Sequence, residues 1–455
     1  MKITYLFGFI LLMNTVFAQK EDSIQIASIY KNALNSTIAH KNLNYLCKNY
    51  SERLCGSENA EKAILWGKEA MQKLGFDTVY LQKTMVKHWV REKNEICNIS
   101  STKLGQFNAN VIALGESVGT SGNGIEANVI EISSFEELKK LGREKIAGKI
   151  VFFNFKMNND YFMTFHAYGD AAGYRVHGAS EAAKYDAKAV IIRSLSLISS
   201  KNPHTGIMRY DEEINKIPAV AISTIDADSL STWLKNDNNL QIYLKTNTKF
   251  LPETLSYNVI GEIRGEKTPE KIITVGGHLD SWDNCEGAHD DGVGCMHAME
   301  VGRIFKDLNI KPSNTIRTVL FMDEETNQRG GKSYAEETKS KNETIIAALE
   351  SDAGGFTPQG FSIDGNESQL QKLQTWKPLF EPYGLFYFKK GWGGVDIHPL
   401  KEQGVPLIGL IIDSQRYFDY QHSSTDVFEA VNRRQMQLGS GSLASLIYLI
   451  DKYGL

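Results

Sequence analysis

Residues 278–294 read HLDSWDNCEGAHDDGVG and hold two histidines and five acidic residues, several of them beside glycines. The stretch follows the apolar run KIITVGG and leads into GVGCMHAMEVGRIFKDL, whose apolar residues recur at helical spacing. A strand, a polar loop and a helix in this order indicate an α/β sheet, in which ligands bind beyond the carboxyl ends of the strands. A solvated loop would account for the charge but not for its neighbours.

The chain beyond residue 250 continues this alternation of strands and helices. Strands are expected at 257–265, 271–277, 314–323, 344–352 and 405–412, and helices at 292–308, 330–340, 367–381 and 433–453. This pattern predicts the α/β class, with a twisted mixed sheet and helices on both of its faces.

The first half of the chain has a different pattern of apolar residues. Residues 20 to about 82 read as helical, most clearly at 60–76, and 77–90 alternates like a strand. From about 110 to 250, short apolar runs joined by brief helical pieces suggest a separate module without a catalytic cluster. The expected division is an export signal at 1–18, followed by parts at 19–110, 111–250 and 251–455.

Composition sets limits on location and partners. With 455 residues, 42% hydrophobic residues and a formal charge of −4, the chain reads as a two-domain globular protein without a nucleic-acid surface. Residues 1–18, MKITYLFGFILLMNTVFA, have the layout of a secretory signal. We therefore expect an exported protein without a membrane anchor, and the sequence leaves periplasmic and extracellular locations open.

The five cysteines leave two alternatives open. Cys47 with Cys55 and Cys285 with Cys295 are candidate disulfides, but an odd count leaves one thiol over. Ordinary buried cysteines are at least as good an explanation. Since no CxxC pair occurs, neither a redox motif nor a cysteine-rich zinc site is expected.

Polar clusters stand at successive strand ends and predict a metal centre. Crowded carboxylates repel one another, and a divalent cation removes that penalty. Histidine nitrogen with carboxylate oxygen suits zinc, and two zinc sites that share one carboxylate need five ligands. The five candidates are His278, Asp290, Glu325, Asp352 and His422.

Two further acids have expected roles around this centre. In His278-x-Asp280, alternation along an extended chain points both side chains the same way, so Asp280 is expected to hold the second imidazole nitrogen. Glu324 and Glu325 would point apart, so that one binds metal while the other serves as general base. A single-metal HExxH site is absent from the sequence.

Each of these residues also has an ordinary explanation. A single His-x-Asp is usually an incidental surface pair, and Glu-Glu a solvated edge. Because these clusters all follow successive strands, such explanations do not account for the group of residues as a whole. The remaining polar residues nearby are expected to be non-ligands, with His289 pointing away, His297 on an amphipathic helix, and Asp283, Glu286 and Asp323 solvated or supporting the ligands.

The order His-x-Asp, GAHDDGVG, DEE, ESDAG and HSSTD resembles the co-catalytic di-zinc exopeptidase family, of the aminopeptidase and glutamate carboxypeptidase type. The likeness covers nearly the whole chain after residue 18, including RLCGSENAEKAILW, YRVHGASEAAKYDAKAVIIRS and NPHTG. It implies a phosphorylase/hydrolase-like fold with an inserted protease-associated domain at 111–250, two Zn²⁺ per chain and a homodimer.

The resemblance also implies roles for single residues. Asp290 would bridge the two metals and be joined to Asp291 by a cis peptide; the other ligands would be His278 with Asp352 and Glu325 with His422. Glu324 would be the general base, and Asp280 would orient His278. The chain departs from the family pattern at Val427, where threonine is usual, and at His289, where a smaller or apolar residue is common.

These roles predict hydrolysis of short peptides, particularly dipeptides with free ends, by a water that bridges two zinc ions. A broad aminopeptidase is the near alternative. A glutaminyl cyclase, which typically uses one zinc, and a receptor-like binding protein without catalysis are the alternatives from other classes. Asp396, in GWGGVDIHP, is a candidate for contact with a substrate amino group, although a structural turn explains it equally well.

Overall fold

The computed structural model describes residues 20–455, so the predicted export signal at 1–18 lies outside the described residues. A helix over residues 20–35 comes first. The other α-helices are α2 (Ile38–Asn49), α3 (Glu58–Lys73), α4 (Phe135–Ile146), α5 (Thr164–Ala183), α6 (Thr224–Asn236), α7 (Val293–Asp307), α8 (Arg329–Ser340), α9 (Glu367–Thr375), α10 (Lys377–Phe380), α11 (Tyr417–Tyr420) and α12 (Arg433–Tyr453).

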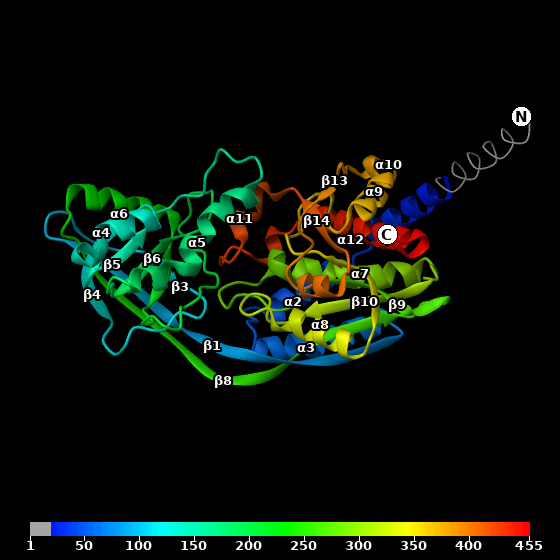
Figure 1. Ribbon diagram of the computed structural model, residues 1–455, viewed down its shortest axis with the longest axis horizontal. Helices are drawn as coiled ribbons and strands as arrows, with labels where there is room; N and C mark the ends of the chain where they lie inside the picture. The colour runs from blue at the N-terminus through cyan, green and yellow to red at the C-terminus, as the bar shows by residue number, and fades with distance from the viewer. Residues whose placement is uncertain (1–19) are drawn as a thin grey trace, which may run out of the picture.

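The strands form one mixed sheet in the described part of the chain (Figure 1). They are β1 (Thr78–Ser101), β2 (Gly105–Asn108), β3 (Val111–Ala113), β4 (Ile125–Ile132), β5 (Ile150–Phe153), β6 (Ala189–Arg193), β7 (Ala219–Ile222), β8 (Gln241–Ile263), β9 (Thr268–His278), β10 (Asn314–Phe321), β11 (Thr344–Glu350), β12 (Pro358–Asp364), β13 (Tyr387–Lys390) and β14 (Leu407–Ile412). Their order is β13-β12-β14-β11-β9-β10-β8-β4-β5-β6-β7-β3, with β1 paired to β8 and β2.

The sheet contains both parallel and antiparallel pairs, as a mixed α/β sheet does. β9 runs parallel to β10 and β11, and β11 runs parallel to β14. β8 runs antiparallel to β10, and β12 antiparallel to β14. The predicted α/β class with a mixed sheet is therefore confirmed.

Helices cover both faces of the central strands because successive side chains point to opposite sides. Val259 and Leu320 belong to the core that α3, α7 and α12 cover, whereas their neighbours Ile260 and Val319 belong to the core beneath α8. In β9, Ile273 and Ile272 divide in the same way. The near-continuous apolar runs of these strands reflect burial on both faces.

A long antiparallel ribbon of β1 and β8 joins two lobes (Figure 1). The smaller lobe consists of β2 to β7, α4 to α6 and the adjoining halves of β1 and β8. Its sheet has an apolar core on each face, one beneath α6 and one beneath α4 and α5. The larger lobe carries the other strands. Because β8 crosses residue 250 without a break, the domain boundaries drawn from the sequence remain predictions.

Most expected elements of the larger lobe are present within a few residues of their expected bounds. Two short strands, β12 and β13, were not expected. The helical stretch predicted to extend to about residue 82 ends earlier, since β1 begins at Thr78. In the smaller lobe, α5 is a 20-residue helix rather than a brief connection.

The fold is held by its apolar cores. All five cysteines are free and buried, so the ordinary-cysteine alternative applies to each of them. Among residues 20–455, none of the helices has both the length and the apolar composition needed to cross a bilayer.

Candidate metal centre

Three parallel strands, β9, β10 and β11, place the residues of the centre at one edge of the sheet. β9 ends at His278, which lies beside Phe321 of β10, and Glu350 at the end of β11 lies beside Gly276 of β9. The residues that follow β10 and β11 therefore meet His278 at the same edge. This edge collects His278, Asp290, Glu324, Glu325, Asp352 and, after α11, His422.

Glycines let the loop between β9 and α7 pass close to the strands. A Cβ on Gly277 would lie 2.5 Å from Asp291 Oδ2, and a Cβ on Gly294 would overlap the carbonyl oxygen of Ser351. Only glycine fits so tight an approach of backbone to backbone. The peptide bond between Asp290 and Asp291 is cis, as the family resemblance implied.

The five candidate ligands form two groups that share Asp290. His278 Nε2 lies 3.3 Å from Asp290 Oδ1 and 3.4 Å from Asp352 Oδ1. His422 Nε2 lies 3.3 Å from Asp290 Oδ2 and 3.1 Å from Glu325 Oε2. Within each group of three, the ligand atoms all lie within 4.8 Å of one another. The two oxygens of one carboxylate thus face two separate sets of donors.

The chemistry of this donor set fits divalent zinc. Four of the five side chains, all but that of Asp352, are less than a tenth exposed, although three of the five are carboxylates. Asp290 Oδ2 and Glu325 Oε1 are buried and accept no hydrogen bond. Buried carboxylate oxygens without partners are costly, and a cation between them removes that cost. Each group offers three protein ligands, as catalytic zinc sites usually do.

The ionisation of the centre reflects this crowding. Burial, with repulsion from Asp290, raises the pKa of Glu325 to about 7. Burial, with repulsion from Asp352, raises the pKa of Glu350 to about 8. Burial alone would lower the pKa of His278, but the surrounding aspartates outweigh it and hold that pKa well above its ordinary value. The pKa of His422 is raised in the same way, with Glu325 as the main opposing cause.

Metal-free protein is expected to lose stability as the pH rises from about 5 to about 8. A group whose pKa is raised in the folded state binds more protons there than in the unfolded chain, so its contribution fades as the pH rises through the folded value. Glu325, Glu350, His278 and His422 all act in this direction. The lowered pKa of Asp290 acts in the opposite direction, but only at acid pH.

The measurement is thermal unfolding of chelated protein at matched ionic strength, with a lower Tm expected at pH 8 than at pH 6. Returned zinc is expected to raise the Tm more at pH 8, because ligands bind metal in their deprotonated forms. A metal-free Tm that is constant or rises over this range would contradict the prediction.

Asp280 lies beside His278 but holds it differently from the expectation. His278 Nδ1 donates to the backbone oxygen of Asp280 at 3.0 Å, whereas the carboxylate lies 3.7 Å from that nitrogen. The Asp280 carboxylate instead accepts from the backbone N–H groups of Glu324 and Glu325, at 3.2 and 3.4 Å. Asp280 therefore fixes the loop that carries both glutamates as well as the histidine.

Three further residues support the ligands, a role that was predicted from the sequence for none of them. Asp426 accepts from the backbone N–H groups of His289 and Asp290, at 2.7 and 3.1 Å. Asp291 accepts from those of His278 and Gly294. Arg53 is fully buried and donates to the carbonyl oxygens of Leu279, Glu286 and Gly287. Together they fix both ends of the loop between His278 and Asp290. Two of them stand in motifs quoted from the sequence, Asp291 in GAHDDGVG and Asp426 as the last residue of HSSTD.

The polar residues expected to be non-ligands lie outside both ligand groups. His289 stacks on Phe356 with ring centroids 4.3 Å apart, and burial lowers its pKa to about 4. His297 bonds Ser351 and the Met436 carbonyl inside the core. Asp283 pairs with Arg91 at 2.6 Å, and Glu286 pairs with Lys48 at 2.7 Å.

Two acids each had two expected settings. Asp323, expected to be solvated or to support the ligands, is fully buried; it accepts from the Asn327 backbone N–H, and burial raises its pKa to about 6. Asp396 is also fully buried, and neither of its carboxylate oxygens has a hydrogen-bond partner. Burial and repulsion from Glu350 raise the pKa of Asp396 well above its ordinary value. Its burial favours the structural turn over contact with a substrate amino group, the two alternatives that the sequence left open.

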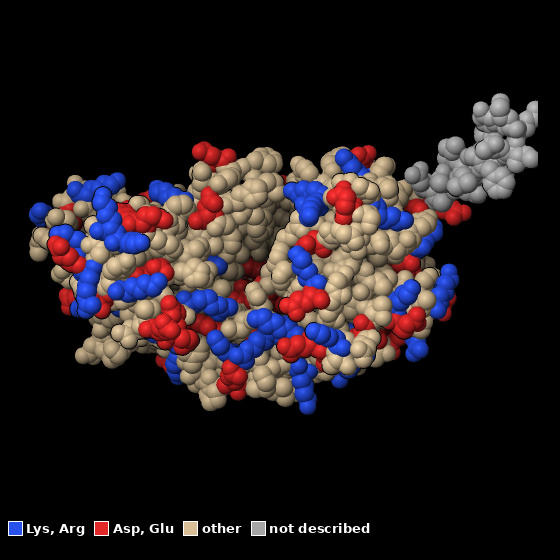
Figure 2. Space-filling model, in the orientation of Figure 1, with Lys and Arg blue, Asp and Glu red and all other residues tan. Residues whose placement is uncertain are grey.

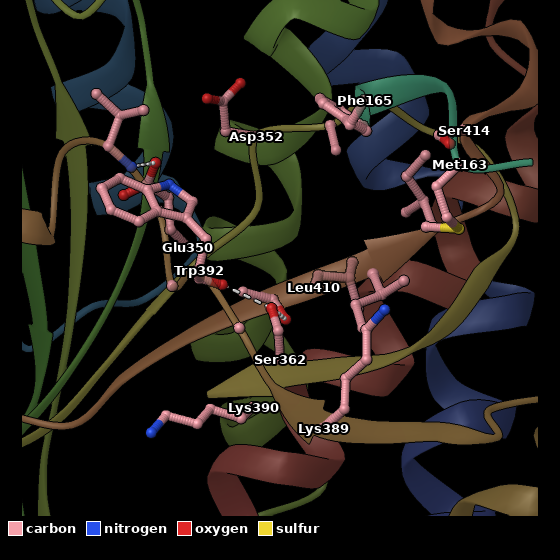
Figure 3. Close-up of a pocket in the computed structure, with 18 of the residues that line it drawn as sticks. Met163, Phe165, Glu350, Asp352, Ser362, Lys389, Lys390, Trp392, Leu410 and Ser414 are labelled. Atoms are coloured by element: carbon pink, nitrogen blue, oxygen red, sulfur yellow. Dashed lines mark hydrogen bonds between the residues drawn. The ribbon is translucent and has the colours of Figure 1, made fainter. Parts of the chain in front are cut away.

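The centre opens into a hollow between the lobes, with acidic residues at its base (Figure 2). Beside it lies a cavity of about 430 Å³. Figure 3 shows Asp352 at one end of this cavity, Lys389 and Lys390 at the other, and Met163 and Phe165 of the smaller lobe on one wall. Its lining is mainly apolar, with Leu410, Ile411, Ile412 and Trp392 among its residues.

Comparison with known proteins gives consistent matches over this arrangement. The sequence model of Peptidase family M28 matches residues 258–444. Carboxypeptidase Q of Bos taurus is 32% identical over 438 residues, which are 95% of this chain and 90% of that protein. The crystal structure of a Peptidase M28 precursor from Shewanella amazonensis is 31% identical, with a TM-score of 0.90 over 95% of this chain and 97% of the other.

A more distant structure shares the fold. The zinc aminopeptidase from Bacillus subtilis is 21% identical, with a TM-score of 0.65 over 90% of this chain and 93% of the other. At that identity the likeness bears on the fold alone.

Proposed function

The chain belongs to peptidase family M28, and on that basis we propose that it is an exported exopeptidase that hydrolyses dipeptides with free termini at a centre of two zinc ions. That it is a zinc metallopeptidase follows from the family. The substrate, the number of ions and the roles of single residues are the proposed part.

The observation that carries the proposal is the pair of three-residue groups that share Asp290. His278 and Asp352 would hold one ion, Glu325 and His422 the other, and Asp290 both. When bound, zinc lowers the pKa of water and polarises the scissile carbonyl. A single ion, as in a glutaminyl cyclase, would leave one of these groups unused.

Glu324 is the proposed general base. Its carboxylate lies 3.9 Å from His278 Nε2, and its side chain is 14% exposed, so it reaches the open side of the centre while belonging to neither group. Burial and the neighbouring carboxylates hold its pKa well above the ordinary value, which favours proton uptake. Glu324 would take the proton of the attacking water and pass it to the leaving amine.

The surroundings of the centre suit a short substrate. The cavity beside Asp352 is mainly apolar and of a size that accepts one amino-acid side chain with its backbone. The smaller lobe supplies one wall of that cavity and would limit substrate length, and we propose that it is the protease-associated insert. Export by residues 1–18 and a homodimeric assembly complete the proposal.

The function is tested with purified protein on free dipeptides, N-blocked dipeptides and aminoacyl anilides, before and after chelation and zinc return. Cleavage confined to free dipeptides, lost on chelation and restored by zinc, is the expected result. Rapid anilide cleavage would shift the assignment to a broad aminopeptidase, the second candidate.

The same assay separates the remaining classes. No metal-dependent cleavage of any peptide, together with cyclisation of N-terminal glutamine, would indicate a glutaminyl cyclase. Neither reaction would indicate a binding protein. Either outcome would end the peptidase proposal.

A further inference from the structure

A loop of the smaller lobe, residues 204–209, reaches across the cleft to the metal centre. Its residues belong to the NPHTG stretch and the turn after it, in which the sequence showed no catalytic cluster. His204 and Thr205 are almost fully buried. His204 forms an antiparallel bridge with Ser423, directly after His422. This loop therefore packs against backbone that carries a candidate ligand.

Thr205 holds both the backbone and the ring of His422. Its N–H donates to the His422 carbonyl at 3.0 Å, and its carbonyl lies 3.3 Å from His422 Nδ1. Because a carbonyl only accepts, Nδ1 must carry the proton, which leaves the lone pair of Nε2 directed at Asp290 and Glu325. Partners of this kind fix the tautomer and orientation of metal-binding histidines.

The backbone of His422 has a conformation that needs such support. Its φ of 59° lies in the left-handed region, which residues with a side chain seldom adopt. On one side, Asn284 Nδ2 donates to the His422 carbonyl at 3.2 Å. On the other, His204 Nδ1 donates to the carbonyl of Gln421 at 2.7 Å. With the two contacts of Thr205, three of the contacts that hold this turn thus come from the smaller lobe.

The same loop reaches the strand end that carries the glutamates. Arg209 Nη2 donates to the backbone oxygen of Thr326, the residue after Glu325. Its guanidinium also lies 3.5 Å from Glu116 of the smaller lobe. One short segment therefore contacts the chain beside both His422 and Glu325, the two ligands particular to one metal group.

The other metal group has no such contact. Among the described residues, the hydrogen bonds of His278 and of the loop after β11 that carries Asp352 all stay within the larger lobe. Asp290 is held by Asp426, also in the larger lobe. The two groups therefore differ in what supports them.

We infer that residues 204–209 position His422 and Glu325, so that the group Asp290, Glu325 and His422 binds its ion only while the smaller lobe is docked. The group His278, Asp290 and Asp352 binds independently of that lobe. The inference rests on the proposed di-zinc function. It makes metal occupancy of one half of the centre a consequence of the contact between the lobes.

The decisive variant is Gly206→Ala. Gly206 has a φ of 137°, and a Cβ there would lie 2.5 Å from Arg175 Nη1 and 2.7 Å from His422 Nδ1. The substitution therefore displaces the loop from the histidine ring. Loss of partners around a metal ligand weakens metal binding by about 10- to 100-fold. Competitive zinc titration of Gly206→Ala is expected to show that loss for one of two ions and an unchanged affinity for the other.

A double-variant cycle identifies which ion is affected. In a His422→Ala background, where that ion is already lost, Gly206→Ala is expected to change zinc affinity no further. In an Asp352→Ala background, it is expected to weaken the remaining ion by the same factor as in the wild type. Arg209→Met, which removes only the bond to Thr326, is expected to have a smaller effect in the same direction.

Matched controls separate positioning from general damage to the lobe. Gly124→Ala places a Cβ 2.9 Å from the Leu244 carbonyl at a φ of 86°, within the smaller lobe, and is expected to leave both affinities unchanged. Arg193→Met, which breaks a pair with Asp228 in that lobe, is the control for Arg209→Met.

Equal weakening of both ions, or unchanged binding in Gly206→Ala and Arg209→Met, would overturn the inference. If Gly206→Ala does not fold, Arg209→Met decides. Wild-type protein that binds two ions but cleaves no peptide would refute the proposed function and leave the titration valid. Wild-type protein that binds fewer than two ions would refute both the inference and the proposed function.

Discussion

Replacing Glu324 with glutamine is expected to lower kcat by about 10²- to 10⁴-fold while both metal groups keep their ions. Glutamine has the same shape but cannot take a proton from water. Glu324 belongs to neither ligand group, so its amide should leave metal binding largely intact. The measurement combines steady-state kinetics on a free dipeptide with metal analysis of the same preparation.

Two comparisons make this result specific. Glu324→Asp retains a carboxylate on a side chain one methylene shorter, farther from the attacking water, and is expected to recover part of the lost rate. Glu253→Gln, at an exposed glutamate paired with Arg329, controls for loss of a charge elsewhere and is expected to have wild-type kinetics. Near wild-type turnover in Glu324→Gln would remove Glu324 from the role of base, and loss of metal would make it a ligand.

Replacing Asp290 with asparagine is expected to weaken both ions together, by more than about 100-fold each, and to abolish turnover. Asp290 is the residue common to the two groups, with one oxygen toward each histidine. An amide offers one neutral oxygen in place of two charged ones. In metal-free protein the Asp290 carboxylate also lies against His278 and His422, which lower its pKa, so metal-free Asp290→Asn should be less stable than metal-free wild type.

Metal analysis and thermal unfolding of chelated protein test this pair of effects. Asp352→Asn is the matched control, because it belongs to one group and should weaken one ion. Asp291→Asn tests the neighbouring aspartate, whose carboxylate accepts hydrogen bonds from backbone N–H groups and belongs to neither ligand group. If Asp290→Asn lost one ion and kept the other, Asp290 would not be shared.

The sequence predicted the parts of the molecule that depend on local pattern. Parallel strands place their carboxyl ends at one edge, so the polar residues after β9, β10 and β11 had to converge whatever the details of the loops. His278, Glu325 and Asp352 are accordingly brought together. The strands β12 and β13 were missed because β12 carries the turn residues Pro358 and Gly360 and β13 is only four residues long.

The residues that hold the ligands could not be predicted in the same way. Arg53 and Thr205 act through backbone carbonyls of distant segments, and a carbonyl leaves no mark in the sequence. For Asp280 the position was predicted but the hydrogen-bond partners of its carboxylate were not. Alternation placed it correctly beside His278, but its carboxylate is used by the N–H groups after β10, which only the tertiary arrangement supplies.

The ribbon of β1 and β8 has a consequence for the order in which the chain folds. It pairs Ser100 with Gln241 at one end and Thr78 with Glu262 at the other, residues far apart in the sequence. Closing so long a loop is entropically unfavourable until the intervening chain has condensed. Once the smaller lobe forms, Ser100 and Gln241 are already adjacent, and the ribbon can extend from there into the larger lobe. The smaller lobe is thus the expected nucleus, and mutations in its core should slow the folding of the whole chain.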